Sequence, residues 1–342
     1  MKAVFLTKKT NANSAFEIKE INTPKPNPGE VLIKVKSFGL NYADVMARLD
    51  LYPDMPKMPC VLGYDVLGEI YEVGEGVQSF KNGDFVVALT RFGGYAEYAV
   101  ADERVCVCVS RELKSHNALA IATQLSTAYH AAVENVNLFE NDIVLVHAAA
   151  GGVGLGIVAI ALSKKCIVIG IAGSDEKCDF LKSLGVHHTI NYKKEVFDEG
   201  VKRLGYRKKI DVIFDSVGGE NVPKGMKILN SDGKLVLFGS AKLSESKNKL
   251  KIIYQVFKFG FFSPIKLLMP SKSIIGLNML AIADNKPQIV QRCMQGVAAL
   301  LEKGVFKDAL QGETFSIDQL VLAHEKLESG RSIGKLAVEW HA

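Results

Sequence analysis

A glycine-rich turn is the segment of this sequence whose residue types best suit the binding of an anion. The apolar run Ile143 to Val146 leads to Ala150-Gly151-Gly152-Val153-Gly154, and a second apolar stretch then fits a helix. Without side chains the backbone approaches a phosphate closely, and a following helix directs its free N–H groups and positive dipole end at the anion. In this strand-to-helix context, Ala150, Gly151, Gly152, Val153 and Gly154 predict a dinucleotide pyrophosphate site. The alternative is a turn that only allows close packing of helix on sheet.

The end of the next predicted strand bears on which dinucleotide is bound. The run Ile167 to Ile171 ends in Ala172-Gly173-Ser174, without the carboxylate that NAD-preferring sites place there for the ribose 2′-hydroxyl. A hydroxyl from Ser174 and an ammonium from Lys177 complement a 2′-phosphate. The pattern therefore favours NADPH over NADH, although Asp175 is close. The alternative is that Ser174 only caps a helix and Lys177 is solvated.

Two kinds of element must position these residues. The first hundred residues contain short strands with turn punctuation, at 31–35, 68–74 and 83–88, which predict a mostly antiparallel β domain. From about Leu138, strand-like runs alternate with helical stretches, which predicts a parallel sheet covered by helices on both faces. One long helix is expected from Pro287 to Lys303. The fold class is therefore α/β, with two domains.

Composition limits the classes of protein to consider. The chain has 342 residues, and its net charge of +5 is too small for a dedicated nucleic-acid binder. Its six cysteines form no Cys-x-x-Cys pair, which fits reduced thiols in a cytoplasmic protein. Residues 143–163 carry no formal charge apart from a possible His147, and they are long enough to cross a bilayer. The glycines in their middle favour a strand, a turn and a helix instead.

Seven fragments spread over nearly the whole chain carry a family resemblance. They are Gly39-Leu40-Asn41-Tyr42-Ala43-Asp44-Val45-Met46-Ala47-Arg48, Leu51-Tyr52-Pro53, Gly63-Tyr64-Asp65-Val66-Leu67-Gly68, Val73-Gly74-Glu75-Gly76-Val77, Ala149-Ala150-Gly151-Gly152-Val153-Gly154, Asp215-Ser216-Val217-Gly218-Gly219 and Gly330-Arg331-Ser332-Ile333-Gly334-Lys335. With them the chain resembles the medium-chain dehydrogenase/reductase superfamily, in its quinone oxidoreductase (zeta-crystallin-like) branch. Within that branch it is most similar to the vesicle amine transport protein-like members.

The resemblance implies a domain organisation and a set of site residues. It implies a GroES-like substrate domain from residues 1–123 and 267–342, a doubly wound Rossmann NADPH-binding domain from 124–266, and a nicotinamide cleft. Its family positions place Asn41 and Tyr52 at the nicotinamide and substrate pocket, Thr127 at the cofactor, Tyr192 near the 2′-phosphate, and Gly239 and Ser240 in a loop near the cofactor. It also implies a homodimer joined through a strand around Ser273 to Leu277.

The positions that bind catalytic zinc in related enzymes hold different residues here. Those relatives carry a cysteine at the position of Asn41 and a His-Glu pair at the positions of Tyr64 and Asp65. An amide and a phenol cannot replace a thiolate and an imidazole as zinc ligands. The lobe that holds a structural zinc is also missing, since Cys106 and Cys108 are too few for four ligands. We therefore expect no bound metal.

A metal-free reductase needs an acceptor that is already electrophilic. We therefore expect NADPH-dependent hydride transfer to quinones or α,β-unsaturated carbonyls, with the Asn41 amide, a ribose hydroxyl or water as the donor to the developing oxyanion. Tyr52 either donates a proton or, as we favour, forms an aromatic wall of the pocket. An enoyl-thioester reductase is an alternative within the enzymes.

The segment 241–272 is basic and aromatic. It holds seven lysines against one glutamate, so its net charge of +6 exceeds the +5 of the whole chain. Basic residues between aromatic ones suit a membrane surface or single-stranded RNA, in a protein that keeps the NADPH fold without catalysis. We favour the other interpretation, an insertion that covers the active-site mouth, with its aromatics packed inward and its lysines solvated.

Overall fold

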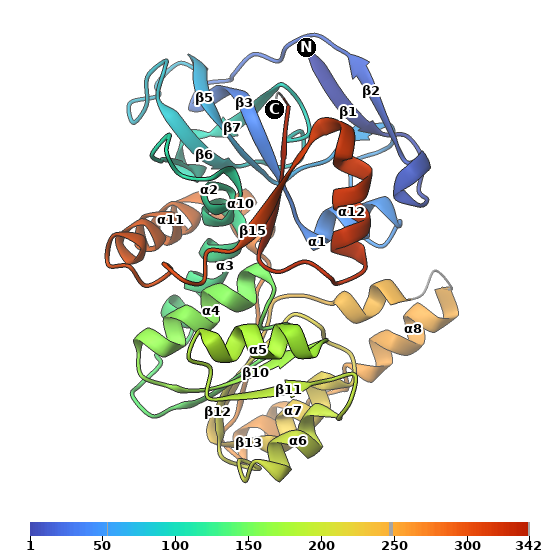
Figure 1. Ribbon diagram of the computed structural model, residues 1–342, viewed down its shortest axis with the longest axis vertical. Helices are drawn as coiled ribbons and strands as arrows, with labels where there is room; N and C mark the ends of the chain where they lie inside the picture. Colours follow the sequence, from blue (N-terminus) through green and yellow to red (C-terminus); the bar gives the residue numbers. More distant parts are fainter. Residues whose placement is uncertain (53, 246–248, 341–342) are drawn as a thin grey trace. The chain divides into compact units, whose positions relative to one another are not determined.

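The computed structural model describes residues 1–52, 54–245 and 249–340, and only the backbone of 244, 245 and 249–252 (Figure 1). Pro53 of the Leu51-Tyr52-Pro53 fragment and residues 246–248 of the basic segment lie outside the described residues. The chain divides into two compact units. The first unit comprises Met1–Ser126, Met279–Ala299 and Leu310–Ala342, and the second comprises Thr127–Asn278 and Leu300–Ala309.

Short strands dominate the first unit. They are β1 (Lys2–Leu6), β2 (Phe16–Glu20), β3 (Glu30–Leu40), β4 (Cys60–Val61), β5 (Asp65–Val73), β6 (Phe85–Leu89), β7 (Tyr98–Asp102), β8 (Cys106–Cys108), β15 (Gly312–Ser316) and β16 (Lys335–Glu339). The larger sheet has the order β15-β16-β3-β5-β6-β8, with β7 also paired to β3, and the smaller sheet has the order β2-β1-β4. All these pairs are antiparallel except β15 with β16, which confirms the mostly antiparallel β domain.

The long central strand β3 alternates between buried and exposed residues from Ile33 to Lys36, whereas it is buried on both faces at 31–33 and 37–40. Ile33 and Val35 are buried in the core of the first unit, whereas Lys34 and Lys36 between and beside them are exposed. Successive side chains of a strand point to opposite faces, so this alternation directs the apolar set inward. Short helices complete the unit: α1 (Tyr42–Arg48), α2 (Ser115–Ala120), α10 (Met279–Asn285) and α12 (Leu320–Glu328).

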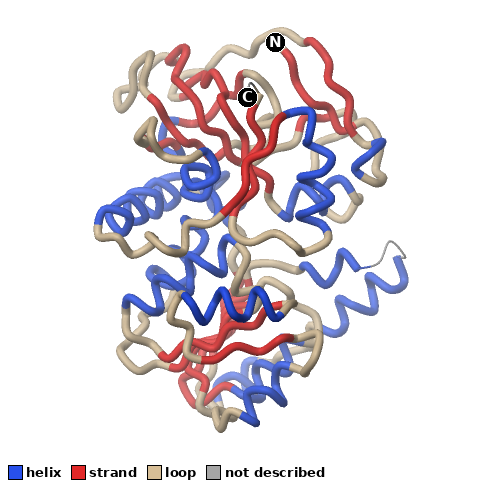
Figure 2. Tube along the Cα trace, viewed as in Figure 1, coloured by secondary structure: helices blue, strands red, loops and turns tan. Residues whose placement is uncertain are grey.

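The second unit contains a parallel sheet whose strands alternate with helices along the chain (Figure 2). Its strands are β9 (Ile143–Val146), β10 (Ile167–Ala172), β11 (His188–Asn191), β12 (Ile210–Asp215), β13 (Leu229–Leu237) and β14 (Ser273–Gly276). Every pair is parallel, and the order is β11-β10-β9-β12-β13-β14. Counted from β9, this is the order 3-2-1-4-5-6 of a Rossmann fold, which binds its ligand where the order reverses, at the carboxyl ends of the first and fourth strands.

The helices of the second unit include a buried one, which explains why residues 143–163 carry almost no charge. They are α3 (Ser126–Tyr129), which starts one residue before the unit, α4 (Gly152–Ser163), α5 (Asp175–Ser183), α6 (Phe197–Arg203), α7 (Asn221–Ile228), α8 (Lys249–Lys258) and α9 (Pro264–Leu268). Helix α4 is buried from Gly154 to Ala161, so residues 143–163 are a buried strand and a buried helix. Among the described residues, no helix combines the length and the apolar character needed to cross a membrane.

The end of the second unit differs from the boundary expected at residue 266. Strand β14 pairs with β13 from Ser273 to Gly276, so the compact unit continues to Asn278. The long helix α11 (Pro287–Glu302) follows, close to the range expected from the sequence. Strand β14 is the outer strand of its sheet, because the described chain pairs it only with β13.

Candidate functional site

The glycine turn lies between β9 and α4, at the reversal point of the parallel sheet. The backbone of Ala148 adopts φ +50°, and the N–H of Gly151 donates to the Ala148 carbonyl over 2.9 Å. Gly151 is the N-cap of α4, and no side chain caps the first turn of the helix. The first N–H groups of a helix have no partner within it, so this end of α4 is suited to an anion.

Gly154 has a steric role, the close packing of a helix that was the alternative interpretation of this turn. A Cβ on Gly154 would lie 2.4 Å from the carbonyl oxygen of Ala148 and 2.8 Å from Cα of Ala149. Both are backbone atoms and cannot swing aside. Helix α4 therefore approaches the turn only because residue 154 has no side chain.

The end of β10 carries the residues assigned to the adenosine side. Ser174 caps α5, with its Oγ accepting from the backbone N–H of Lys177 over 3.3 Å. Tyr192 follows β11, and its hydroxyl lies against Gly173, where an added Cβ would come within 2.7 Å of the Tyr192 oxygen. The structure thus brings Gly173, Ser174, Lys177 and Tyr192 together. A backbone hydrogen bond and then a hydrogen bond from the Ser174 side chain lower the pKa of Glu176, so the Ser174 hydroxyl is engaged by this carboxylate as well.

Asp175, the carboxylate close to this strand end, is engaged by other groups. Lys194 forms an ion pair with it, and Asn191 Nδ2 donates to its Oδ1 over 2.9 Å. The hydrogen bond from Lys194 and then that from Asn191 lower the pKa of Asp175. Lys177 is half-buried, and burial followed by the charge of Lys193 lowers its pKa. The ammonium groups of Lys177 and Lys193 repel each other, and a bound dianion would offset that repulsion.

The loops after β12 and β13 also meet in the second unit. Asp215 Oδ1 accepts from the N–H groups of Val217 and Gly218, at 2.7 and 3.1 Å. A Cβ on Gly239 would lie 2.6 Å from the carbonyl oxygen of Ser216, so the loop that holds Gly239 and Ser240 runs directly against the loop after β12. Gly239 and Ser240 were expected near the cofactor from the family resemblance, whereas no role was predicted for Asp215.

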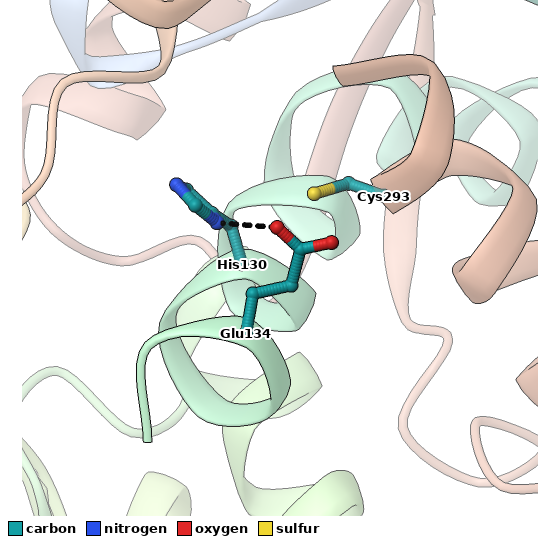
Figure 3. Close-up of side chains that lie close together, drawn as sticks. All are labelled: His130, Glu134 and Cys293. Atoms are coloured by element: carbon teal, nitrogen blue, oxygen red, sulfur yellow. Dashed lines mark hydrogen bonds and ion pairs between the residues drawn. The ribbon is translucent and has the colours of Figure 1, made fainter. Parts of the chain in front are cut away.

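Thr127 lies on α3 and is buried. One helical turn further on, His130 Nδ1 and Glu134 Oε2 in η4 (His130–Glu134) are 3.1 Å apart. Figure 3 shows these two side chains facing each other. This pair is spaced four residues apart in a helical segment, where side chains face each other. The sequence analysis did not single it out.

In the first unit, Asn41 lies between β3 and α1 in a set of buried polar groups, Asn41, Asp65 and Lys335, which we call the Asn41 cluster. Asn41 Nδ2 donates to Asp65 Oδ1, and Lys335 Nζ donates to Asn41 Oδ1 over 2.9 Å. Lys335 Nζ also lies 2.6 Å from Asp65 Oδ2. Asp65 and Lys335 are fully buried, and Asn41 is 9% exposed. No residue pattern pointed to Lys335, whose place in the cluster depends on the fold.

Asp44 contacts the Asn41 cluster through the backbone. Its carboxylate accepts from the N–H of Asn41 over 2.8 Å and from the N–H of Gly63 over 3.2 Å. Burial is the largest cause that raises the pKa of Asp44, to about 7, and the charge of Asp65 adds to it. The backbone N–H of Asn41 and the charge of Lys335 oppose that rise.

Tyr52 and Tyr64 form an aromatic layer beside this part of the first unit. Their ring centroids are 6.1 Å apart in an edge-to-face arrangement, and Tyr64 is 5.0 Å from the ring of Phe92. Tyr64 is buried, whereas Tyr52 is half-buried. Burial, followed by the charge of Asp54, raises the pKa of Tyr52. A phenol with a raised pKa is a weaker acid, which favours the wall over the proton donor.

The basic aromatic segment differs from the favoured expectation. Phe259 and Phe262 pack against the core of the second unit, but Tyr254, Phe257 and Phe261 are exposed. The prediction that the aromatics pack inward is therefore wrong for these three. One lysine is structural, because Lys272 Nζ donates to the Met226 carbonyl over 2.7 Å.

Comparison with known proteins identifies the family. Residues 27–111 match the family model of the alcohol dehydrogenase GroES-like domain, and residues 152–295 match that of the zinc-binding dehydrogenase. The quinone oxidoreductase of Lama guanicoe is 30% identical over 321 residues, which are 93% of this chain and 91% of that protein. The chain belongs to the quinone oxidoreductase family. It is thus an oxidoreductase of the medium-chain dehydrogenase/reductase type, as the resemblance implied.

Two further relatives bear on the comparison. The synaptic vesicle membrane protein VAT-1 homolog of Rattus norvegicus is 29% identical over 315 residues, covering 92% of this chain and 77% of that protein. The quinone oxidoreductase of Escherichia coli, solved as a complex with NADPH, superposes with a TM-score of 0.85 at 24% identity, over 99% of this chain and 100% of that one. At 24% identity the superposition establishes the fold alone, and both units of this chain share that fold.

Proposed function

We propose that this quinone oxidoreductase family member transfers hydride from NADPH to quinones or α,β-unsaturated carbonyls without a metal. The observation that carries the proposal is the glycine turn at the reversal point of a 3-2-1-4-5-6 sheet. The residues fit a pyrophosphate there, because Gly151 offers no side chain and Gly154 allows the helix end to approach. The NADPH complex of the Escherichia coli relative supports the assignment.

The preference for NADPH rests on the end of β10. We infer that Ser174, Lys177 and Tyr192 hold the 2′-phosphate, with Lys193 as a second ammonium. Contacts among Gly173, Ser174, Lys177 and Tyr192 at this strand end support the inference. Asp175, one of the acidic groups nearby, is held by Lys194 and Asn191. A carboxylate that is paired in this way repels a phosphate less than an open one does.

The residues of the first unit suit an acceptor that needs no metal. Bound NADPH supplies the hydride. The Asn41 amide is a hydrogen-bond donor for oxygen that gains negative charge, and Tyr52, packed edge-to-face on the buried Tyr64, provides an aromatic surface. Asn41 Oδ1 accepts a hydrogen bond from Lys335, and Asn41 Nδ2 donates one to Asp65. Asn41 and Asp65 occupy the positions of two zinc ligands in related enzymes, and here the Lys335 ammonium contacts both.

The experiment follows NADPH oxidation by the purified protein with four acceptors: a quinone, an α,β-unsaturated ketone, a crotonyl thioester and a saturated ketone. We expect turnover with the quinone or the enone, no turnover with the saturated ketone, a higher kcat/KM for NADPH than for NADH, and rates unchanged by a zinc chelator. Turnover with the crotonyl thioester alone would favour the enoyl-thioester reductase. Absence of turnover with every acceptor, or loss of activity on chelation, would overturn the proposal.

A homodimer is a further expectation, formed through the outer edge of β14. Within the described sheet, β14 pairs with β13 on one side and with no strand on the other. An unpaired strand edge can pair with the same edge of a second copy. Light scattering on the purified protein checks the mass. The N–H of Leu277 donates to Leu237 of β13, so by the alternation of a strand the N–H of Ile274 points to the open edge. Ile274→Pro should therefore give a monomer that still binds NADPH, because proline removes that outward donor. A monomeric wild type would contradict this expectation.

A second candidate function is contact with an anionic membrane surface through α8 and α9. Eight of the fourteen most exposed large apolar side chains of the described residues lie between 253 and 269: Ile253, Tyr254, Val256, Phe257, Phe261, Ile265, Leu268 and Met269. No acidic residue occurs from 249 to 272, and Lys266 is exposed beside Ile265. Apolar side chains with lysines around them suit a lipid headgroup boundary. The name of the VAT-1 relative, a synaptic vesicle membrane protein, supports this candidate.

Vesicle sedimentation tests this candidate. We expect binding to vesicles with anionic lipid, weakened by salt, and little binding to zwitterionic vesicles. Phe261→Ser with Leu268→Ser should weaken binding by about tenfold or more, since each side chain loses apolar burial. Phe139→Ser is the matched control, because Phe139 is exposed in the same unit but lies outside this segment. Equal binding by the control and the double variant, or binding to RNA alone, would contradict the membrane assignment.

A further inference from the structure

The Asn41 cluster is assembled from three strands of one sheet. Strand β3 lies between β16 and β5, and Lys335 and Asp65 are the first residues of those two neighbours. Their side chains meet over Gly39 of β3, where an added Cβ would be 2.1 Å from Asp65 Oδ2 and 2.4 Å from Lys335 Cε. The missing side chain in the central strand is therefore what lets the two charged groups reach each other and Asn41.

The two charged partners determine how the Asn41 amide is turned. A lysine ammonium only donates, so the atom that faces Lys335 is the oxygen. An ionised carboxylate only accepts, so the atom that faces Asp65 is the nitrogen. Both contacts exclude the flipped amide. Nδ2 has two hydrogens, and within the described part of the chain Asp65 accepts only one of them.

The same contacts change the strength of the amide as a donor. The ammonium on Oδ1 withdraws electrons from the amide, and hydrogen bonds in a chain polarise one another. Both charges are fully buried, so water does not screen this effect. The second hydrogen of Nδ2 is therefore a fixed and polarised donor, the kind of group that stabilises a developing oxyanion.

We propose that Lys335 and Asp65 are positioning residues that fix the Asn41 amide as the hydrogen-bond donor to the acceptor oxygen during hydride transfer. The inference rests on the proposed function, because it assigns the oxyanion to the same site. It makes Lys335 and Asp65 important for the rate of the chemical step and unimportant for binding of NADPH.

The test uses a neutral replacement of the charged pair in the full-length protein. Asp65→Asn with Lys335→Met removes both charges at nearly constant volume, so no unpaired charge stays buried. Asp65→Asn with Lys335→Gln is the second variant, for the case in which that double variant does not fold, because it also leaves no buried charge unpaired and keeps a polar side chain at position 335. Glu328→Gln is the matched control, because Glu328 pairs with the fully buried Arg48 in the same unit without touching Asn41.

The kinetic readout separates positioning from general damage. We expect the double variant to lose about 100-fold in kcat with an enone, as for loss of one oxyanion donor, while the KM for NADPH stays within about twofold. The loss should be smaller with an electron-poor quinone, whose oxygen needs less stabilisation. Asp65→Asn with Lys335→Gln should lose less than Asp65→Asn with Lys335→Met, because the glutamine amide still donates to Oδ1 of Asn41. The control should keep wild-type kcat with both acceptors.

A second readout does not depend on turnover. In protein labelled with ¹⁵N at asparagine, the side-chain signals of Asn41 are identified by their absence in Asn41→Ala. We expect these signals to show two resolved protons that exchange slowly with solvent. In the double variant they should lose this protection.

The outcomes distinguish the two proposals. If the wild type reduces an enone and the folded double variant keeps its kcat, or if its Asn41 signals stay protected, the positioning role is wrong while the proposed function stands. An equal loss with both acceptors means a structural role and also overturns the inference. If the wild type reduces no acceptor, the proposed function fails, and the catalytic consequence of the inference fails with it.

Discussion

The glycine turn of the second unit and the Asn41 cluster of the first unit both depend on a missing side chain, but they use the space differently. At the turn, the space admits only backbone, since the atoms nearest an added Cβ on Gly154 belong to Ala148 and Ala149. In the cluster, the space above Gly39 is filled by the charged ends of Asp65 and Lys335. The turn thus offers N–H groups from a helix end, whereas the cluster orients a side-chain amide with two buried charges.

This difference determines how each region responds to substitution. The turn carries no side-chain charge, so it should be sensitive to added volume and insensitive to pH. The cluster lies in contact with Asp44, a titrating buried carboxyl, so it should be sensitive to both volume and pH. The predictions below use these two sensitivities to separate the regions.

The largest effect is expected for Gly39→Ala. The new methyl group would lie between Asp65 Oδ2 and Lys335 Cε, and it would separate the buried ion pair. Separating such a pair leaves uncompensated charge, which costs about 3–5 kcal/mol of the free energy of unfolding. Chemical denaturation measures it. Gly276→Ala is the control, because nothing lies within 4 Å of an added Cβ there. A loss as small as that of the control would show that the cluster contributes little.

The pH dependence of stability provides the next test. Burial raises the pKa of Asp44 to about 7 in the folded protein, from an ordinary value of 3.8 for this carboxyl. Between these values the unfolded chain binds fewer protons, so the free energy of unfolding falls as pH rises through the window. Between about pH 5 and about pH 8, the wild type should lose about 2–3 kcal/mol relative to Asp44→Asn.

Denaturation of both proteins at the two pH values measures this difference. The comparison with the variant cancels the contribution of every other titrating group. A difference that does not change with pH would mean that Asp44 stays ionised in the folded state.

The two regions also differ in how far the sequence predicts them. The glycine turn, the strand before it and the helix after it are contiguous, so local patterning located Ile143–Val146 correctly and predicted the alternation of strands and helices. The mostly antiparallel first unit followed from short strands with turn punctuation. The Asn41 cluster joins positions 41, 65 and 335, and only the pairing of β16 and β5 with β3 brings them together. Lys335 is the last residue of the fragment from Gly330 to Lys335, and no role was predicted for it from the sequence.

The basic aromatic segment shows another limit of sequence patterning. Tyr254, Phe257 and Phe261 were expected to pack inward because aromatic burial is favourable, yet Phe259 and Phe262 take the places against the core. Tyr254 and Phe257 lie in α8, whereas Phe259, Phe261 and Phe262 lie between α8 and α9. The five aromatics therefore share no helical face, and no helical period predicts which of them are buried. Which of them face the core depends on how α8 and α9 lie on the sheet, and the spacing alone does not specify this.

A smaller effect is expected from Gly154→Ala at the turn. The methyl group would meet the backbone of Ala148 and Ala149, so α4 must shift away from the turn. Such overpacking costs about 1–3 kcal/mol of stability, and NADPH affinity should fall by at least about tenfold. Denaturation and NADPH fluorescence titration measure the two quantities, with Gly276→Ala as control. The loss should be the same at low and high pH, in contrast to that of the cluster, and a pH-dependent loss would remove the distinction between the regions.

The smallest effect concerns the adenosine end of the second unit, where charge rather than volume should matter. Lys177→Met removes one of the two ammonium groups at the end of β10 and keeps most of the side-chain volume. The KM for NADPH should rise by about tenfold, with the KM for NADH unchanged, because only NADPH carries the 2′-phosphate. Lys182→Met on the same helix is the matched control, since Lys182 pairs with Asp179 at 3.0 Å. An equal rise for both cofactors would mean that Lys177 supports the helix end instead, and the NADPH preference would then need another source, such as Lys193.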